Sequence, residues 1–214
     1  MRAKQKRPYQ SAVRERQAAD TRQRIATAAR RLLAAKGYAA MTIDAVAREA
    51  EVAAQTVYAV FGSKIGILNE ILDEARFDET YQELVRQART APDPRARLLY
   101  AARIARQIFD SERPVLDLLR GAGVLAPELS RVERERESMR YERQAPLIEY
   151  LAKKKHLRAG LSQTRAREIL WTLTSRDLYR MLVRERGWPS QEFEDWLGDT
   201  LLRALTGDSI NRGS

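Results

Sequence analysis

The sequence predicts an all-α protein, and two observations lead to this fold class. Glycine and proline are scarce, with 10 and 7 residues in a chain of 214, and they fall between segments whose apolar residues recur at helical spacing. Alternation of apolar and polar residues over the length of a strand is not sustained anywhere. We therefore expect a three-helix helix-turn-helix domain at the N-terminus, followed by a helical-bundle domain.

Four segments in the N-terminal third carry helix signals. The first helix is expected over residues 20–36, because Gly37 favours a helix end. Thr42 is a candidate N-cap for a short second helix, since its hydroxyl can accept from a free amide of the first turn. A short third helix is predicted over residues 54–60, and a fourth helix from Lys64 onwards.

Longer helices are expected in the rest of the chain. Pro114 suits the first position of a helix, where its missing N–H is not needed. Residues 130–156 are predicted to form one charged helix that Pro146 kinks, because proline cannot donate to the preceding turn. The last stretch should contain two helices, over about residues 163–186 and 190–205.

The composition excludes several classes of site. Cysteine is absent and His156 is the single histidine, which leaves no disulfide, no thiolate nucleophile and no His-rich metal site. Phosphate-binding, dinucleotide-binding, zinc-protease and serine-hydrolase motifs are missing. No apolar run reaches the roughly 18 residues of a membrane span, and the N-terminus lacks the apolar stretch of a secretory signal. We expect a cytoplasmic protein that is not an enzyme, with no metal, no cofactor and no membrane contact.

The positive charge is concentrated at the N-terminus. Residues 1–66 contain 13 basic and 5 acidic side chains, whereas the other 148 residues contain 26 and 24. A basic segment joined to a nearly neutral body is typical of a polyanion-binding module attached to a second domain. The alternative is a basic tail that only improves solubility.

Two short helices after a longer one, inside the basic segment, are the layout of a helix-turn-helix. The second short helix would present its N-terminal residues to base edges in the major groove, beginning at Ala54. Gln55 can pair with an adenine edge, and Thr56 can contact a thymine methyl group or a phosphate. Tyr58 and Lys64 can reach phosphates. Thr42 lies at the start of the second helix, whose free amides can bind a further phosphate. The alternative is an ordinary small helical bundle.

The same stretch resembles the DNA-binding domain of TetR/AcrR-type transcriptional regulators. The resemblance rests on Gly37-Tyr38, on Thr42-Ile43, and on the run Thr56-Val57-Tyr58, Phe61, Ser63-Lys64 and Leu68. It covers about 48 residues, and the C-terminal stretch from Ile169 to Leu197 resembles the tail of many such regulators. The resemblance implies DNA contacts at Thr42, Gln55, Thr56, Tyr58 and Lys64, and a second domain that binds a ligand and dimerises.

Three positions depart from the pattern of this family. Glu51 stands where the turn usually has glycine, so a left-handed backbone there would be strained. Ala53 stands where a serine cap is frequent, and Val60 where a polar residue often contacts the DNA backbone. The arginine-rich residues before the first helix could compensate, at phosphates or in the minor groove.

Four segments follow from this interpretation: a basic, flexible arm over 1–19, the DNA-binding domain over 20–66, the ligand-binding and dimerisation domain over 67–206, and a disordered tail over 207–214. The candidate walls of a ligand pocket are Ile104, Ile108, Phe109, Leu116, Leu119, Met139 and Trp171. The candidate dimer residues are Leu178, Leu182, Phe193, Trp196, Leu197 and Leu201. For both sets, packing within the core of a single chain is the alternative.

The function expected from these features is transcriptional regulation. A homodimer would bind a palindromic operator on double-stranded DNA, act as a repressor, and be released by a small, largely apolar effector. An activator of the same family and a non-specific DNA-coating protein are the alternatives.

Overall fold

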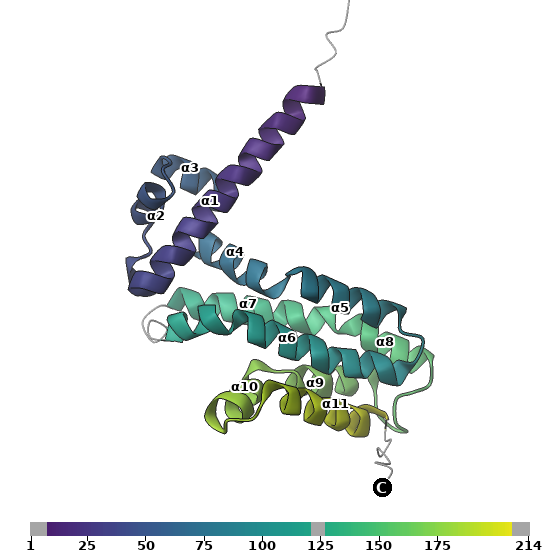
Figure 1. Ribbon diagram of the computed structural model, residues 1–214. Helices are drawn as coiled ribbons and strands as arrows, with labels where there is room; N and C mark the ends of the chain where they lie inside the picture. Colours follow the sequence, from purple (N-terminus) through teal and green to yellow (C-terminus); the bar gives the residue numbers. More distant parts are fainter. Residues whose placement is uncertain (1–7, 121–126, 207–214) are drawn as a thin grey trace, which may run out of the picture. The chain divides into compact units, whose positions relative to one another are not determined.

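A computed structural model describes the backbone of residues 8–120 and 127–206, and the side chains of residues 14–74, 77–111 and 134–206. Within these ranges every regular element is helical, which confirms the predicted fold class (Figure 1). The elements are α1 (Pro8–Ala40), α2 (Ile43–Glu49), α3 (Ala54–Phe61), α4 (Lys64–Arg76), α5 (Glu79–Thr90), α6 (Pro94–Arg120), α7 (Pro127–Arg143), α8 (Ala145–Lys153), α9 (Gln163–Leu173), α10 (Arg176–Tyr179) with a π-helical continuation (Arg180–Glu185), and α11 (Ser190–Thr206).

The described residues form two compact units, each with its own hydrophobic core. The first unit comprises the described residues of Met1–Leu72 and Val115–Leu129, and the second those of Asp73–Pro114 and Ser130–Ser214. The domain limits expected from the sequence remain predictions.

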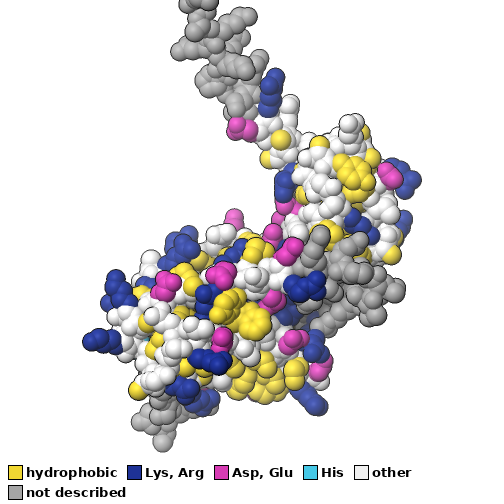
Figure 2. All heavy atoms as spheres, turned by 180° about the vertical axis from the view of Figure 1, so that it is seen from behind, with side chains coloured by type: hydrophobic (Ala, Val, Ile, Leu, Met, Phe, Trp, Pro, Cys, Tyr) yellow, Lys and Arg dark blue, Asp and Glu magenta, His cyan; other side chains and the backbone are white. Residues whose placement is uncertain are grey.

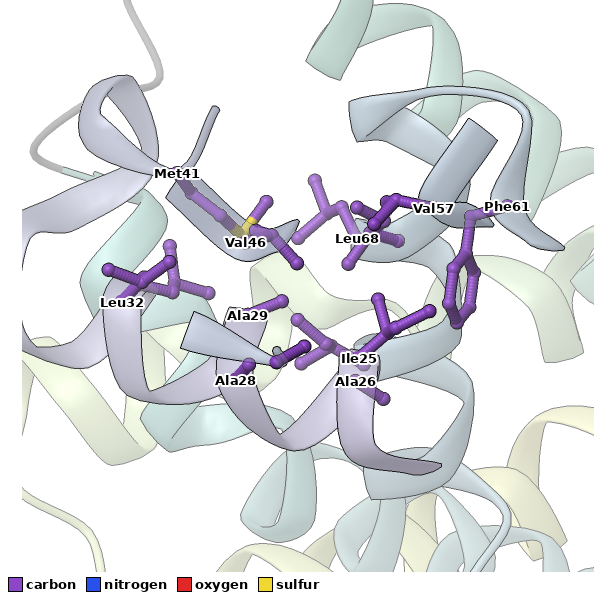
Figure 3. Close-up of a cluster of buried hydrophobic side chains, with 14 of the residues drawn as sticks. Ile25, Ala26, Ala28, Ala29, Leu32, Met41, Val46, Val57, Phe61 and Leu68 are labelled. Atoms are coloured by element: carbon purple, nitrogen blue, oxygen red, sulfur yellow. The ribbon is translucent and has the colours of Figure 1, made fainter. Parts of the chain in front are cut away.

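In the first unit, α1 supplies the central stripe of the core. Ile25 and Ala29 are fully buried, and Figure 3 shows them in one cluster with Val46 of α2, Val57 of α3 and Leu68 of α4. Ile25 and Ala29 are four residues apart, as are Val57 and Phe61, which puts each pair on one face of its helix. The apolar faces of α1, α2, α3 and α4 therefore meet in one core.

The second unit is held by a core to which five of its helices contribute. Leu98 and Phe109 of α6 are buried together with Leu151 of α8, Leu170 of α9 and Leu197 of α11. Tyr179 of α10 adds a tilted ring contact with Phe109, with the centroids 5.2 Å apart. Pairs of this geometry add favourable ring–ring interaction to the burial of apolar area.

The first helix begins earlier than the sequence analysis predicted. The structure starts α1 at Pro8, so residues 8–19 belong to this helix. The Thr21 hydroxyl donates to the Gln17 carbonyl at 2.8 Å, as a threonine inside a helix does, so Thr21 does not begin the helix. At its other end the prediction is confirmed: Gly37 has a φ of 76° and interrupts the helical backbone.

Pro114 does not begin a helix, so the prediction that it occupies the first position of one was wrong. It lies inside α6, which runs from Pro94 to Arg120. Proline removes the one hydrogen bond to the carbonyl of Asp110 but leaves φ close to its helical value. The helix-forming residues on both sides are sufficient to continue it.

Two breaks divide the C-terminal helices. The kink predicted from Pro146 lies at Gln144, a single residue between α7 and α8 whose backbone stays close to helical, with φ −86° and ψ −15°. The helix predicted over 163–186 is also interrupted, because α9 ends at Leu173 and Ser175 caps α10 by accepting from the amide of Leu178. A serine inside an apolar periodic segment does not reveal from sequence alone whether it caps a helix or faces solvent.

Exposed apolar side chains are dispersed in the part of the chain whose side chains are described. The large ones are Tyr58, Leu99, Met139 and Met181, which belong to four different elements. On the face drawn in Figure 2, hydrophobic, basic and acidic side chains are interspersed. No helix within the described ranges combines the length and the apolar character needed to cross a membrane.

We expect Leu197→Ala to lower the free energy of unfolding by about 2–5 kcal/mol, because a fully buried leucine leaves a cavity when truncated. Met181→Ala is the control: this side chain is 47% exposed, and its loss should change stability by less than about 0.5 kcal/mol. Chemical denaturation of both variants at one protein concentration measures the difference. Equal effects of the two substitutions would contradict the assignment of Leu197 to the core.

Candidate nucleic-acid interface

The N-terminus of α2 is capped as predicted. Thr42 has an extended backbone, with φ −82° and ψ 158°, and its Oγ1 accepts from the amide of Ala45 at 3.1 Å. Asp44 in the first turn complements the helix dipole. The Thr42 side chain is exposed at this end of the helix, where an incoming phosphate could also reach free amides.

The turn between α2 and α3 is strained at Glu51. Its φ is 53°, so the left-handed backbone considered in the sequence analysis is present without glycine. This conformation costs about 1–2 kcal/mol for a residue that carries a Cβ. The turn is closed by the Val52 amide, which donates to the Ala47 carbonyl at 3.0 Å.

The N-terminus of α3 lacks a side-chain cap. Ala53 holds the extended N-cap backbone, with φ −70° and ψ 146°, but offers no side-chain acceptor. The departure from the family pattern at this position therefore has the expected structural result.

One face of α3 is anchored and the other is exposed. Val57 and Phe61 are buried, one helical turn apart, in the core of the first unit. Gln55 and Tyr58 are exposed on the opposite side, and Tyr58 is 54% exposed. Since residues three apart share a helix face, the structure brings these two predicted contacts together.

Three further positions on α3 complete this face and its edges. Ala54 and Thr56 are half-buried, and Ala54 packs against the core. Ala59 is exposed four residues after Gln55, so it lies on the same face. The sequence analysis missed Ala59, although the helical period measured from Gln55 would have found it.

Lys64, the sixth predicted contact, is engaged with the end of α1. Its Nζ lies 3.8 Å from the centre of the Tyr38 ring and donates to the Ala39 carbonyl at 3.4 Å. This ammonium group therefore ties the start of α4 to α1, and only part of its surface remains available for a phosphate.

Arginines of α1 also serve the structure of the first unit. The Arg22 Nε donates to Glu70 Oε1 at 2.6 Å, and its guanidinium lies 4.8 Å from the centre of the Phe61 ring. The hydrogen bond to Glu70 raises the pKa of Arg22 above its ordinary value. Arg24 donates to backbone carbonyls of the turn after α2. The count of basic residues thus overstates the charge that is free to meet a polyanion.

In the second unit, the candidate pocket residues have different environments. Phe109 is buried in the core, Ile104 and Ile108 are half-buried, and Met139 is 47% exposed. Trp171 lies beside Arg140, whose guanidinium carbon is 5.2 Å from the centre of its ring. The side chains of Leu116 and Leu119 lie outside the described residues. The assignment of these seven residues to a pocket remains a prediction.

The candidate dimer residues divide into two groups. Phe193, Leu197 and Leu201 are 0% exposed within the single chain, so the alternative of core packing applies to them. Leu178, Leu182 and Trp196 are half-buried and retain surface that a partner can contact. The apolar stripe of α11 was predicted correctly, but most of it is covered by the chain itself.

The described residues contain no cluster of three or more histidine, aspartate or glutamate side chains placed to bind a metal ion.

Part of the first unit is similar to a known protein family. Residues 25–71 match the family model of "Bacterial regulatory proteins, tetR family". No curated protein matches the sequence significantly.

Several solved structures share the fold. A putative TetR-family transcriptional regulator from Syntrophomonas wolfei has a TM-score of 0.69 and 18% sequence identity, over 86% of this chain and 94% of that chain. NalD, the secondary repressor of the MexAB-OprM multidrug efflux pump in Pseudomonas aeruginosa, has a TM-score of 0.66 and 21% identity, over 89% and 99% of the two chains. FadR from Bacillus subtilis, in complex with stearoyl-CoA, has a TM-score of 0.64 and 15% identity, over 85% and 98%.

We expect Ala53→Ser to raise the free energy of unfolding by about 1 kcal/mol, because a serine hydroxyl at this N-cap can accept from an amide of the first turn of α3. Ala59→Ser is the matched control, since it adds the same hydroxyl in the exposed middle of the same helix. Denaturant unfolding of both variants measures the effect. A gain in the control as large as that at residue 53 would contradict a capping origin.

Proposed function

Because residues 25–71 match the family model of bacterial tetR regulatory proteins, we propose that this chain is a regulator of that family, a homodimeric repressor that binds a palindromic operator and is released by a small molecule. The observation that carries the proposal is the two-sided character of α3. Its buried face, through Val57 and Phe61, fixes the helix in the first unit, while Gln55 and Tyr58 are left exposed on the other side. A rigidly held exposed helix is what readout of base edges in a major groove requires.

Dimerisation follows from the small size of this surface. The recognition helix has 8 residues, too few to give tight specific binding by themselves. Two copies related by a two-fold axis can address half-sites about 34 Å apart, one turn of DNA. We place the dimer contact at the half-buried residues Leu178, Leu182 and Trp196.

Release by an effector is proposed for the second unit. FadR, which shares the fold, was solved with stearoyl-CoA, and NalD is described as a repressor of an efflux pump. An apolar effector of this chain would bind among the candidate pocket residues of α6, α7 and α9. It would weaken DNA binding if it preferred a different spacing of the two recognition helices, because a ligand shifts an equilibrium only by its differential affinity.

Enrichment of a random duplex library on the purified protein, at near-physiological salt, tests the proposal. An enriched palindrome supports a sequence-specific dimer. Salt-sensitive binding without enrichment would favour a non-specific DNA-coating protein, whose affinity comes from phosphates alone. A protein that retains no duplex at all would refute the proposed function.

We expect Gln55→Ala to relax base preference at one position of each half-site, with a loss of about 1–3 kcal/mol for the preferred base. Gln23→Ala is the control, because Gln23 is an exposed glutamine of α1 and not of α3. Binding of both variants to the enriched duplex and to single-base substitutions of it measures the effect. A loss from Gln55→Ala that is the same for every sequence would remove Gln55 from base readout.

We expect stearoyl-CoA at saturation to weaken binding to the enriched duplex roughly 5- to 150-fold, the usual range of coupling between two sites. Free CoA, which has the same headgroup without the acyl chain, should have no effect. Fluorescence anisotropy of the labelled duplex measures both. If stearoyl-CoA left the affinity unchanged, a long acyl chain would not be the effector.

A further inference from the structure

The turn that leads into the recognition helix has an unusual support. Glu51 adopts the left-handed conformation that glycine favours, with φ 53°. An L residue in this conformation persists only where surrounding contacts hold it. The side chain that supplies such contacts comes from α1.

Arg24 donates to the two carbonyls on either side of the left-handed bend. Its Nη2 lies 2.6 Å from the carbonyl oxygen of Ala50 and 3.3 Å from that of Glu51. Ala50 follows the last residue of α2. The last carbonyls of a helix accept no hydrogen bond from within the helix, so they need another donor. A positive group at this end also complements the helix dipole.

The backbone that carries Arg24 is itself fixed. The next residue, Ile25, is fully buried in the core of the first unit, and Ala28 one turn further is 4% exposed. The guanidinium therefore connects a rigid part of α1 to the turn from which α3 departs.

We propose that Arg24 is a positioning residue for DNA recognition: it holds the left-handed turn at Glu51 and thereby sets the orientation of Gln55 and Tyr58 on α3. This inference rests on the proposed function, because it assigns a role within the same DNA-binding site. A glycine at residue 51 would adopt the left-handed backbone without strain. With glutamate there, the hydrogen bonds from Arg24 stabilise that backbone.

The surroundings of Arg24 disfavour the alternative role of a phosphate ligand. Arg24 lies on the wall of a groove of about 440 Å³ between α1 and the end of α2, which is also lined by Asp20, Glu49, Glu51 and Arg31. A phosphate entering this groove would meet three carboxylates. Arg24 is itself exposed, but the hydrogen bonds that it makes are to carbonyls of the protein.

A rescue experiment tests the positioning role. Arg24→Ala should weaken binding to the enriched duplex roughly three- to tenfold, while the dependence of affinity on salt keeps its slope, because no phosphate contact is lost. Glu51→Gly in the Arg24→Ala background should restore most of the affinity, since glycine adopts the left-handed backbone without strain. Arg31→Ala is the matched control. Arg31 lies on the same helix and groove, is 73% exposed, and has its guanidinium 4.0 Å from the Glu49 carboxylate and not at the turn carbonyls, so its loss should leave affinity nearly unchanged.

Two results would overturn the inference. A loss in Arg24→Ala with a flatter salt dependence and no rescue by Glu51→Gly would make Arg24 a phosphate ligand. An affinity unchanged in Arg24→Ala would show that the turn does not need it.

A second readout needs no DNA and separates this inference from the proposed function. Amide hydrogen exchange of the full-length protein should quicken in residues 50–57 of Arg24→Ala and return to the native rate in the double variant. If no duplex were enriched by the native protein, the proposed function would fail, while this coupling would still report on the turn. Unchanged exchange in Arg24→Ala would refute the support by Arg24.

Discussion

The burial of one apolar stripe of α1 is the constraint on which the first unit depends. Ile25 and Ala29 have no solvent exposure, and the short helices α2 and α3 are stable only because they cover this stripe. Once Val57 and Phe61 occupy their places in the core, the other face of α3 has to point outward. The exposure of Gln55 and Tyr58 is thus a result of packing, and a substitution in the core would alter the proposed DNA-binding surface without changing any of its residues.

Local signals made the first unit largely predictable from sequence. The N-cap at Thr42, the helix end at Gly37 and the bounds of α3 each depend on a few neighbouring residues, and the structure confirms them. The predicted start of α1 was wrong. The residues after Pro8 can form a helix, but they lack the apolar periodicity from which the prediction recognised helices. The stripe of α11 was visible, but periodicity shows that a face is buried and not which chain buries it. That Leu197 is buried within its own chain could be seen only from the packed structure.

The candidate site shows the same division between local and long-range information. Gln55 and Tyr58 could be predicted because a helical period places them together. The roles of Arg22 and Arg24 could not, since their partners Glu70 and Ala50 are 48 and 26 residues away in sequence. Net charge pointed to the part of the chain that also matches the family model, but the structure uses some of that charge to hold its own helices.

The length of α1 has a consequence for the basic residues near the N-terminus. Residues 8–24 precede the first core residue of this helix, and at 1.5 Å per residue they span about 25 Å of continuous helix. Arg14 and Arg16 are exposed on this part of α1, so the helical backbone fixes the directions in which their side chains leave the helix. When either arginine makes a contact, only its side chain loses conformational entropy. In a flexible arm, the backbone would lose conformational entropy as well.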